Sequence, residues 1–217
     1  MTTGASNIVA AKKAGQDDRD AGRAIAFEDE ALVDRSRKGD MQAFGALVAK
    51  YQDRVVNLAF RLCGRREDAE ELAQEAFLKA LEKIAQFRGA SRFYTWLFRI
   101  TANLAISHRR RKGRIHFHSL DAAAELSASQ AAALTAATAA RREDAPPAAA
   151  MAAETQHRVA AALAELDDGA RLIVLLRDAE DMDYAQIAEV MEIPLGTVKS
   201  RLHRARSALR ERLAAVV

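Results

Sequence analysis

Residues 44–62 carry apolar side chains at every third or fourth position over about five helical turns. The run comprises Phe44, Leu47, Val48, Tyr51, Val55, Leu58, Ala59 and Leu62. This spacing places all of them on one face of an α-helix. Asp40 precedes the run as a cap, and Cys63-Gly64 follows it as a stop signal. Because a one-sided helix must bury its apolar face against another element, the segment predicts a helical domain.

Similar periodicity in neighbouring segments extends this domain. The chain is 50% hydrophobic and has only three Pro and ten Gly among 217 residues. Helices are predicted from Glu28, over residues 68–84 and over residues 93–112, and with the first helix they can form a four-helix bundle over residues 28–112. Residues 1–27 are small, polar and unpatterned, which predicts a disordered tail. Residues 113–154 are rich in Ala, so we interpret them as a flexible linker.

A second helical domain is predicted over residues 155–217. The apolar run of residues 170–176 could be a strand, but the chain offers no partner strand, so a helix is expected. Asp183 and Gln186 form a capping-box pattern for the next helix. Its inward-facing residues are expected to be Tyr184, Ile187, Ala188 and Met191. Pro194 then opens the last helix, and two short helices joined by a tight turn are typical of a helix-turn-helix. The predicted fold class is therefore all-α, with two small helical domains.

Cations are concentrated in two blocks, although the net charge is only +3. One block is residues 109–114, and the other lies in the last helix, with an acidic span between them. Two basic blocks at the ends of helices favour a polyanionic partner. No run approaches the roughly 20 apolar residues that span a bilayer, and no apolar segment that would make a secretory signal follows Lys12 and Lys13. The single Cys63 excludes an intrachain disulfide.

Aromatic side chains are concentrated in residues 87–100, which contain the only Trp, three of the eight Phe and one of the three Tyr. Three arginines lie among them. One helical face is expected to enter the core, and it comprises Phe93, Trp96, Leu97, Ile100 and Leu104. Tyr94 and Phe98 lie elsewhere on this helix, where accessible aromatics beside arginines suit stacking on unpaired bases. The alternative is that all of these aromatics are core residues.

Two further helical faces are candidates for binding. Leu78 is apolar on an otherwise polar face with Glu71, Gln74 and Glu75, which indicates either chance exposure or a protein-docking surface. The outer face of the last helix carries Thr197, Lys199, Ser200, Arg201, His203, Arg204 and Arg206. Its N-terminal half is placed to enter a DNA major groove. The alternative for this second face is an ordinary helical hairpin with a charged surface.

Both halves resemble a bacterial sigma factor of the extracytoplasmic-function group, of the sigma-E type. The match to region 2 runs through Glu71-Leu72-Ala73-Gln74-Glu75-Ala76-Phe77-Leu78-Lys79-Ala80, Phe87-Arg88-Gly89, Phe93–Ile100 and Asn103. The match to region 4 runs through Tyr184-Ala185-Gln186-Ile187-Ala188 and Pro194–Arg206. Where the family usually has a glycine before the helix-turn-helix, Asp181 is expected to tolerate the turn.

The resemblance implies a promoter-specificity subunit, not an enzyme, that binds core RNA polymerase at its β′ clamp and β flap and nucleates DNA opening. Polymerase binding would fall to Glu71, Gln74, Glu75 and Leu78. Recognition and melting of the minus-ten element would fall to Phe87, Arg88, Ser91, Arg92, Tyr94, Phe98, Arg99, Asn103, Arg109 and Arg110. The minus-thirty-five element would be read by Thr197, Lys199, Ser200, His203 and Arg204. An anti-sigma factor, a role in stress response and a cytoplasmic location, near the membrane when sequestered, are implied in the same way.

Two rival functions follow from parts of the sequence. A conventional helix-turn-helix regulator would explain residues 155–213, but it leaves the aromatic segment and the Leu78 face without a purpose. An enzyme is disfavoured because the sequence has no Gly-rich phosphate loop, paired-His motif or nucleophile setting. We expect no catalytic residue, no metal and no cofactor, since His116 and His118 lack further ligands at a usual spacing.

Overall fold

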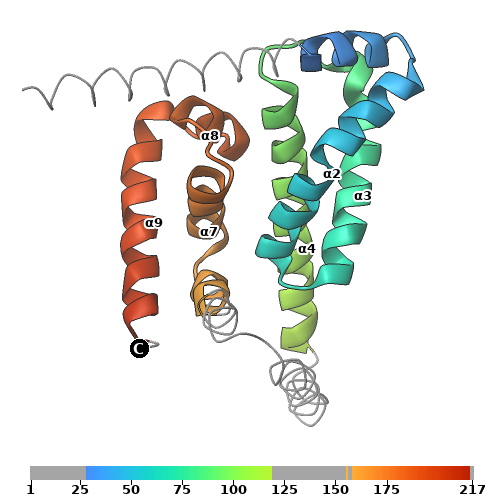
Figure 1. Cartoon of the computed structure of the whole chain (residues 1–217). Coiled ribbons are helices and arrows are strands. Elements are labelled where there is room, and N and C mark those ends of the chain that lie inside the picture. Colours follow the sequence, from blue (N-terminus) through green and yellow to red (C-terminus); the bar gives the residue numbers. More distant parts are fainter. Residues whose placement is uncertain (1–27, 119–154, 156–157, 216–217) are drawn as a thin grey trace, which may run out of the picture.

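The computed structural model describes residues 28–118, 155 and 158–215, and all regular structure in these ranges is helical. Two groups of helices lie side by side (Figure 1). The first group comprises the helix of residues 28–37, α2 (Met41–Cys63), α3 (Arg66–Lys83), the 3-10 turn η1 (Ile84–Gln86) and α4 (Phe93–His118). The second comprises the helix of residues 158–164, α7 (Asp168–Val174), the π-helical turn η2 (Leu175–Ala179), α8 (Tyr184–Met191) and α9 (Leu195–Ala215). The all-α, two-domain prediction is confirmed.

The long helix α2 begins and ends where the sequence predicted. The Asp40 side chain accepts hydrogen bonds from the backbone N–H groups of Gln42 and Ala43. Gly64 ends the helix with φ of 82°, a left-handed conformation that favours glycine, and its N–H donates to the Phe60 carbonyl. The apolar face of α2 is buried against α3 and α4.

Helix α4 extends past the point where the sequence placed the linker. The linker was expected to begin at residue 113, but the helix continues to His118. The basic block Arg109–Lys112 therefore lies within a helix, with Lys112 donating to both oxygens of Asp68 on α3 at 2.8 and 2.6 Å. This bond lowers the pKa of Asp68. The predicted tail (residues 1–27) and residues 119–154 of the linker lie outside the described residues.

The second domain contains the predicted helix-turn-helix. The capping box of α8 is present, because Asp183 accepts from the Gln186 N–H at 2.9 Å and the Gln186 side chain accepts from the Asp183 N–H at 2.9 Å. Asp181 has φ of 56°, so it takes the left-handed turn expected of it. The segment of residues 170–176 is helical as predicted, and it continues into η2.

A single connected core runs through both domains. Helix α4 packs against α8, and α2 contacts α7. A buried arginine crosses the boundary: Arg171 on α7 is 4% exposed and donates to the Leu62 carbonyl at 2.9 Å. The two domains are thus packed directly on each other, which determines how the candidate surfaces below are displayed. None of the helices in the described ranges is long and apolar enough to cross a membrane.

Candidate nucleic-acid interface

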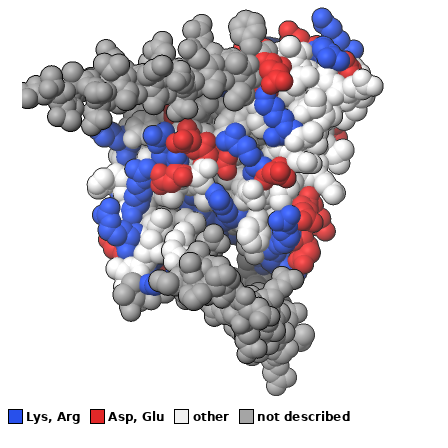
Figure 2. Space-filling view, in the orientation of Figure 1, with Lys and Arg blue, Asp and Glu red and all other residues white. Residues whose placement is uncertain are grey.

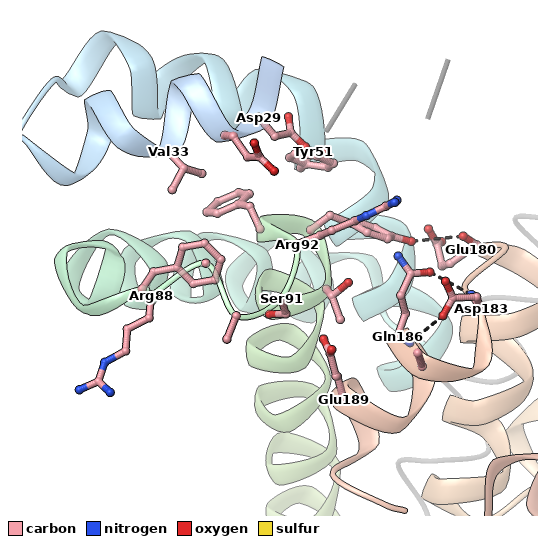
Figure 3. A pocket seen from close by; sticks show the side chains of 18 of the residues that line it. Asp29, Val33, Tyr51, Arg88, Ser91, Arg92, Glu180, Asp183, Gln186 and Glu189 are labelled. Atoms are coloured by element: carbon pink, nitrogen blue, oxygen red, sulfur yellow. Dashed lines mark hydrogen bonds between the residues drawn. The ribbon is translucent and has the colours of Figure 1, made fainter. Parts of the chain in front are cut away.

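The loop between η1 and α4 opens onto a cavity of about 770 Å³ between the two domains. Arg88 and Arg92 are exposed in this loop and Ser91 is half-buried. Gly89 has φ of 70°, a left-handed conformation that favours glycine, so the chain can reverse there before α4 begins. Gln186 and Glu189 of α8 line the same cavity as Ser91, and Figure 3 labels all three. The loop residues that the sequence assigned to minus-ten DNA therefore share one hollow surface.

The ring of Phe87 is buried beneath that surface. It is 8% exposed, its ring centroid is 4.9 Å from that of Trp96, and it meets Phe93 edge-on at 6.2 Å. The ring fills the core beneath the loop, and the assignment of Phe87 to the minus-ten site stays a prediction. Large aromatic rings gain most by such burial, and the sequence pattern of this loop had no feature that separated the two roles.

Tyr94 lies in a polar cluster at the domain boundary. Its hydroxyl accepts from Arg54 Nη2 at 2.7 Å and donates to the Glu180 carbonyl at 3.2 Å. Arg54 also lies 4.3 Å from the Tyr94 ring centroid and donates through Nε to the Glu180 carboxylate at 3.0 Å. Burial raises the pKa of the Tyr94 hydroxyl and that of the Glu180 carboxyl, with the Arg54 charge opposing both shifts. Tyr94 is therefore neutral near pH 7 and acts as a hydrogen-bonding group.

Phe98 was predicted to remain available at the surface, but it is 0% exposed. It contacts the Tyr94 ring at 4.4 Å between centroids. Phe98 lies on the helical stripe that runs from Tyr94 to Arg109, and both ends of this stripe contact the second domain. We correct the surface assignment of Phe98 for this arrangement of the domains. Its ring also lies 5.7 Å from the Arg54 guanidinium of α2, a neighbour that helical periodicity within α4 could not reveal.

The remaining polar candidates on α4 divide into free and paired side chains. Asn103 is exposed. Arg99 lies 3.8 Å from the Glu192 carboxylate, and Arg109 and Arg110 lie 2.7 and 3.5 Å from that of Asp168. All three cations are therefore paired with acidic residues of the second domain. Glu180 and Asp168 are partners that the sequence analysis missed, since no local pattern links them to α4.

The candidate surface for duplex DNA lies on α9. Lys199, Ser200, His203 and Arg204 are exposed on its outer face, and Thr197 is half-buried at its start. Figure 2 shows Lys and Arg side chains gathered along the edge formed by α9, with Asp and Glu gathered next to it over α8. A helix with an exposed basic outer face is the geometry that inserts into a major groove.

Tyr184 joins this surface, contrary to the prediction that it faces inward. It is 40% exposed, lies beside Lys199 and His203 around a small hollow, and has the Arg177 guanidinium 5.8 Å from its ring centroid. Its place at the first residue of α8 explains the difference, because the buried positions of this helix are Ile187 and Val190. Tyr184 is an added candidate for contact with DNA.

The candidate polymerase-binding face on α3 is solvent-accessible. Leu78 is 61% exposed, and Glu71 and Gln74 are exposed beside it. Glu75 is half-buried and pairs with Lys79 one turn away at 3.4 Å. A large apolar side chain that is exposed among charged residues is typical of a surface that binds another protein.

Comparison with known proteins identifies the two domains. Residues 47–115 match the family model of Sigma-70 region 2, and residues 156–209 match that of Sigma-70, region 4. The chain is 36% identical over 182 residues to the RNA polymerase sigma-H factor of Pseudomonas aeruginosa, covering 84% of this chain and 92% of that protein. It is 35% identical over 185 residues to the ECF RNA polymerase sigma-E factor of Haemophilus influenzae, covering 85% and 95%.

The fold has solved counterparts as well. The sigma factor RpoE of Bartonella quintana, solved in complex with the anti-sigma factor NepR, matches with a TM-score of 0.58 at 23% identity, over 79% of this chain and 96% of that one. Both family models, their order along the chain and the identities above agree. Proteins of this kind are DNA-binding subunits for transcription initiation and not enzymes. The chain therefore belongs to the sigma-70 family of RNA polymerase sigma factors, in its extracytoplasmic-function branch.

Proposed function

We propose that the chain binds core RNA polymerase, reads the minus-thirty-five element through α9 and opens the minus-ten element with the loop and exposed face of its first domain. One observation supports this most strongly: a basic helix-turn-helix and a separate aromatic, Arg-rich loop domain occur in one chain, in the order found in sigma factors. A conventional helix-turn-helix regulator would need only the first of these. The chain would act in the cytoplasm, where core polymerase and promoter DNA are found.

Strand opening on this scheme needs no nucleotide hydrolysis. Extracting a base from the duplex costs a few kcal/mol, and stacking a base on an aromatic side chain returns about 1–3 kcal/mol. Phe87 and Phe98 are buried here, so the ring nearest to the surface is the half-buried Tyr94. Arg88 and Arg92 can add cation–π contacts with a base, and Ser91 and Asn103 can add hydrogen bonds. Duplex binding by α9 would supply affinity and register.

An anti-sigma factor is a further proposed partner. The solved sigma factor from Bartonella quintana is bound to one, and the family resemblance implies that such a protein holds the chain inactive by covering the same polymerase- and DNA-binding faces. Co-purification of this chain with an inhibitory protein, released when transcription is induced, would test the assignment.

The decisive experiment is run-off transcription with core polymerase and a promoter library. We expect specific transcripts only when this chain is added, and co-purification of the chain with core polymerase. Binding to duplex DNA without either result would favour the conventional regulator instead.

Replacing Leu78 by aspartate is expected to weaken binding to core polymerase by roughly thirtyfold or more, because an exposed anchor at a docking surface is worth about 2 kcal/mol. Leu78 is 61% exposed, so the fold should tolerate the change. Titration of labelled chain with core polymerase measures the effect. Met41→Asp is the matched control, since Met41 is an equally exposed apolar residue (59%) on α2. Equal loss in both variants would refute a specific role for Leu78.

Replacing Lys199 by alanine is expected to weaken minus-thirty-five binding by 1–3 kcal/mol if the ammonium group reads a base, and to lower the salt slope by about one if it contacts a phosphate. Footprinting at two salt concentrations distinguishes these outcomes. Lys38→Ala removes the same charge from an exposed turn of the other domain. A Lys199→Ala variant that protects the element as well as the Lys38→Ala control would contradict the assignment.

A further inference from the structure

The helix of residues 28–37 carries a buried carboxylate that is bonded to α2. This helix lies before residue 47, where the match to region 2 begins, and it contributes Val33 to the core. Asp29 is 7% exposed, and a carboxylate at such a position must be paired. It accepts hydrogen bonds from the Tyr51 hydroxyl and from Lys50 Nζ, the second at 2.7 Å (Figure 3). Asp29 therefore joins the first helix of the domain to two neighbouring residues of α2.

Tyr51 carries this constraint from Asp29 to α4. Tyr51 is 4% exposed, and its ring stacks on that of Tyr94 with 5.8 Å between centroids and 24° between planes. It also meets the Phe93 ring at 6.0 Å. Burial and the bond to Asp29 raise the pKa of the Tyr51 hydroxyl, so this group stays a neutral donor at physiological pH. The hydroxyl of Tyr51 is thus fixed by Asp29 while its ring rests against the first turn of α4.

Tyr94 is the half-buried ring that the proposed function places nearest to an unpaired base. Besides Tyr51, its ring contacts Phe98 at 4.4 Å between centroids and has the Arg54 guanidinium 4.3 Å from its centroid. Arg54 is itself paired with Glu180 of the second domain, whereas Tyr51 is held by a residue of the first domain. The Asp29–Tyr51 bond therefore supports Tyr94 from within the domain that is proposed to open DNA.

A ring that keeps one orientation is a better surface for stacking than one that changes rotamer. When only a fraction of the molecules is competent to bind, the apparent affinity falls by that fraction. A ring with two or three staggered χ1 wells open to it is correctly placed for roughly a third to a half of the time. If Tyr51 and Tyr94 were both freed in this way, base stacking would weaken by about threefold to tenfold.

We propose that Asp29 is a positioning residue for promoter opening, which holds Tyr51 against Tyr94 through the Tyr51 hydroxyl and so fixes the Tyr94 ring in the orientation that receives an unpaired base. Asp29 itself does not contact DNA in this scheme. The proposal rests on the proposed function, because the orientation of Tyr94 matters only if this surface opens DNA. The alternative is that Asp29 serves the stability of the fold alone.

Two substitutions break the same hydrogen bond from opposite sides. Tyr51→Phe removes the hydroxyl and keeps the ring, and Asp29→Leu removes the carboxylate at a similar volume. The full-length chain is combined with core polymerase and a promoter that carries 2-aminopurine at an adenine of the minus-ten element, at a temperature where urea denaturation shows every variant to be folded. The rate of the fluorescence increase measures opening.

Each single variant should lower the rate of opening by about threefold to tenfold. The double variant should lose no more than the larger single loss, because two changes that remove one shared interaction are not additive. Binding of the same variants to duplex DNA with the minus-thirty-five element should stay at the wild-type level, since Asp29 and Tyr51 lie in the other domain. Wild-type opening rates in both single variants would overturn the proposal.

A Tyr94→Leu background separates positioning from stability. Without the Tyr94 ring there is nothing for Asp29 to position, so Asp29→Leu should cause no further loss of opening there, whereas a loss of stability would act in both backgrounds. Glu28→Gln is the matched control, because Glu28 is the adjacent, exposed residue and bonds the same Lys50 at 3.2 Å rather than Tyr51. It should open promoters at the wild-type rate. An equal defect in this control, or an undiminished Asp29→Leu defect in the Tyr94→Leu background, would contradict the positioning role.

Failure of this inference is distinguishable from failure of the proposed function. Run-off transcription by the wild-type chain tests the function without any substitution. Specific transcripts from the wild type, together with normal opening by Asp29→Leu and Tyr51→Phe, would remove the positioning role alone. A wild-type chain that opens no promoter with core polymerase would refute the function, and the positioning role with it.

Discussion

Replacing Phe87 by alanine is expected to lower the free energy of unfolding by about 3–5 kcal/mol, the usual cost of removing a buried aromatic ring. The ring is 8% exposed and contacts Trp96 and Phe93. The backbone N–H of Phe87 donates to the Ile84 carbonyl at 3.1 Å, and because alanine keeps this bond, the loss comes from the ring alone. Urea denaturation of the full-length chain measures the loss. A small domain has only about 5–15 kcal/mol of stability, so this variant should be partly unfolded near 37 °C.

Arg88→Ala is the matched control, because Arg88 is the next residue and is exposed. Surface changes of this kind usually stay within about 0.5 kcal/mol. If the loop opens promoter DNA, Arg88→Ala should lower open-complex formation while leaving stability intact. The opposite pattern, a stable Phe87→Ala variant with impaired opening, would restore Phe87 as a base-contacting residue and contradict the core position.

The local rules of the sequence predicted the helices well. Asp40, Gly64 and the Asp183–Gln186 capping box act within a few residues of their own position, and each was recognisable for that reason. Asp181 takes its positive φ because the chain must turn between η2 and α8. Caps and turns depend on the local backbone alone. They are therefore expected wherever these helices form, whatever packs around them.

The candidate site was less predictable, because its accessibility depends on contacts between distant segments. Arg54 and Glu180 are 126 positions apart, and nothing near either residue indicates the other. Helical periodicity placed Tyr94 and Phe98 away from the Trp96 face, but it could not show that Phe98 is buried as well, beside Tyr94 and Arg54. Amphipathic patterns reveal which faces are apolar, not which element covers each face.

Asp68 illustrates the same limit in the first domain. The sequence predicted that a helix begins at Asp68. In the structure α3 begins earlier, at Arg66, and Asp68 is buried beside Lys112. The basic end of α4 is thus partly neutralised from within its own domain, and Arg109 and Arg110 are neutralised from the other. A count of cations therefore overstates the charge that this end of α4 offers to DNA in the packed arrangement.

Replacing Arg171 by alanine is expected to cost about 3–5 kcal/mol, because several buried backbone carbonyls lose a charged donor and each unsatisfied buried acceptor costs about 1–3 kcal/mol. The guanidinium group donates to the carbonyls of Leu163 at 2.7 Å and Leu166 at 3.3 Å, as well as to that of Ala164. These carbonyls close the helix of residues 158–164, whose last C=O groups have no partner within the helix. Burial lowers the pKa of Arg171, but an arginine stays charged at any physiological pH.

Arg171 also joins the two domains, because it donates to the Leu62 carbonyl of the first domain. Arg171→Ala should therefore also increase the radius of gyration of the chain in solution. Arg177→Ala is the control, because Arg177 is a half-buried arginine of the same helical segment. It donates to the Met182 carbonyl and lies over the Tyr184 ring, and both of these partners belong to its own domain. Its loss should cost about 1 kcal/mol. If urea denaturation gives equal losses for the two variants, water replaces the guanidinium group and Arg171 does not hold the interface. If stability falls without expansion, Arg171 closes its helix but does not join the domains.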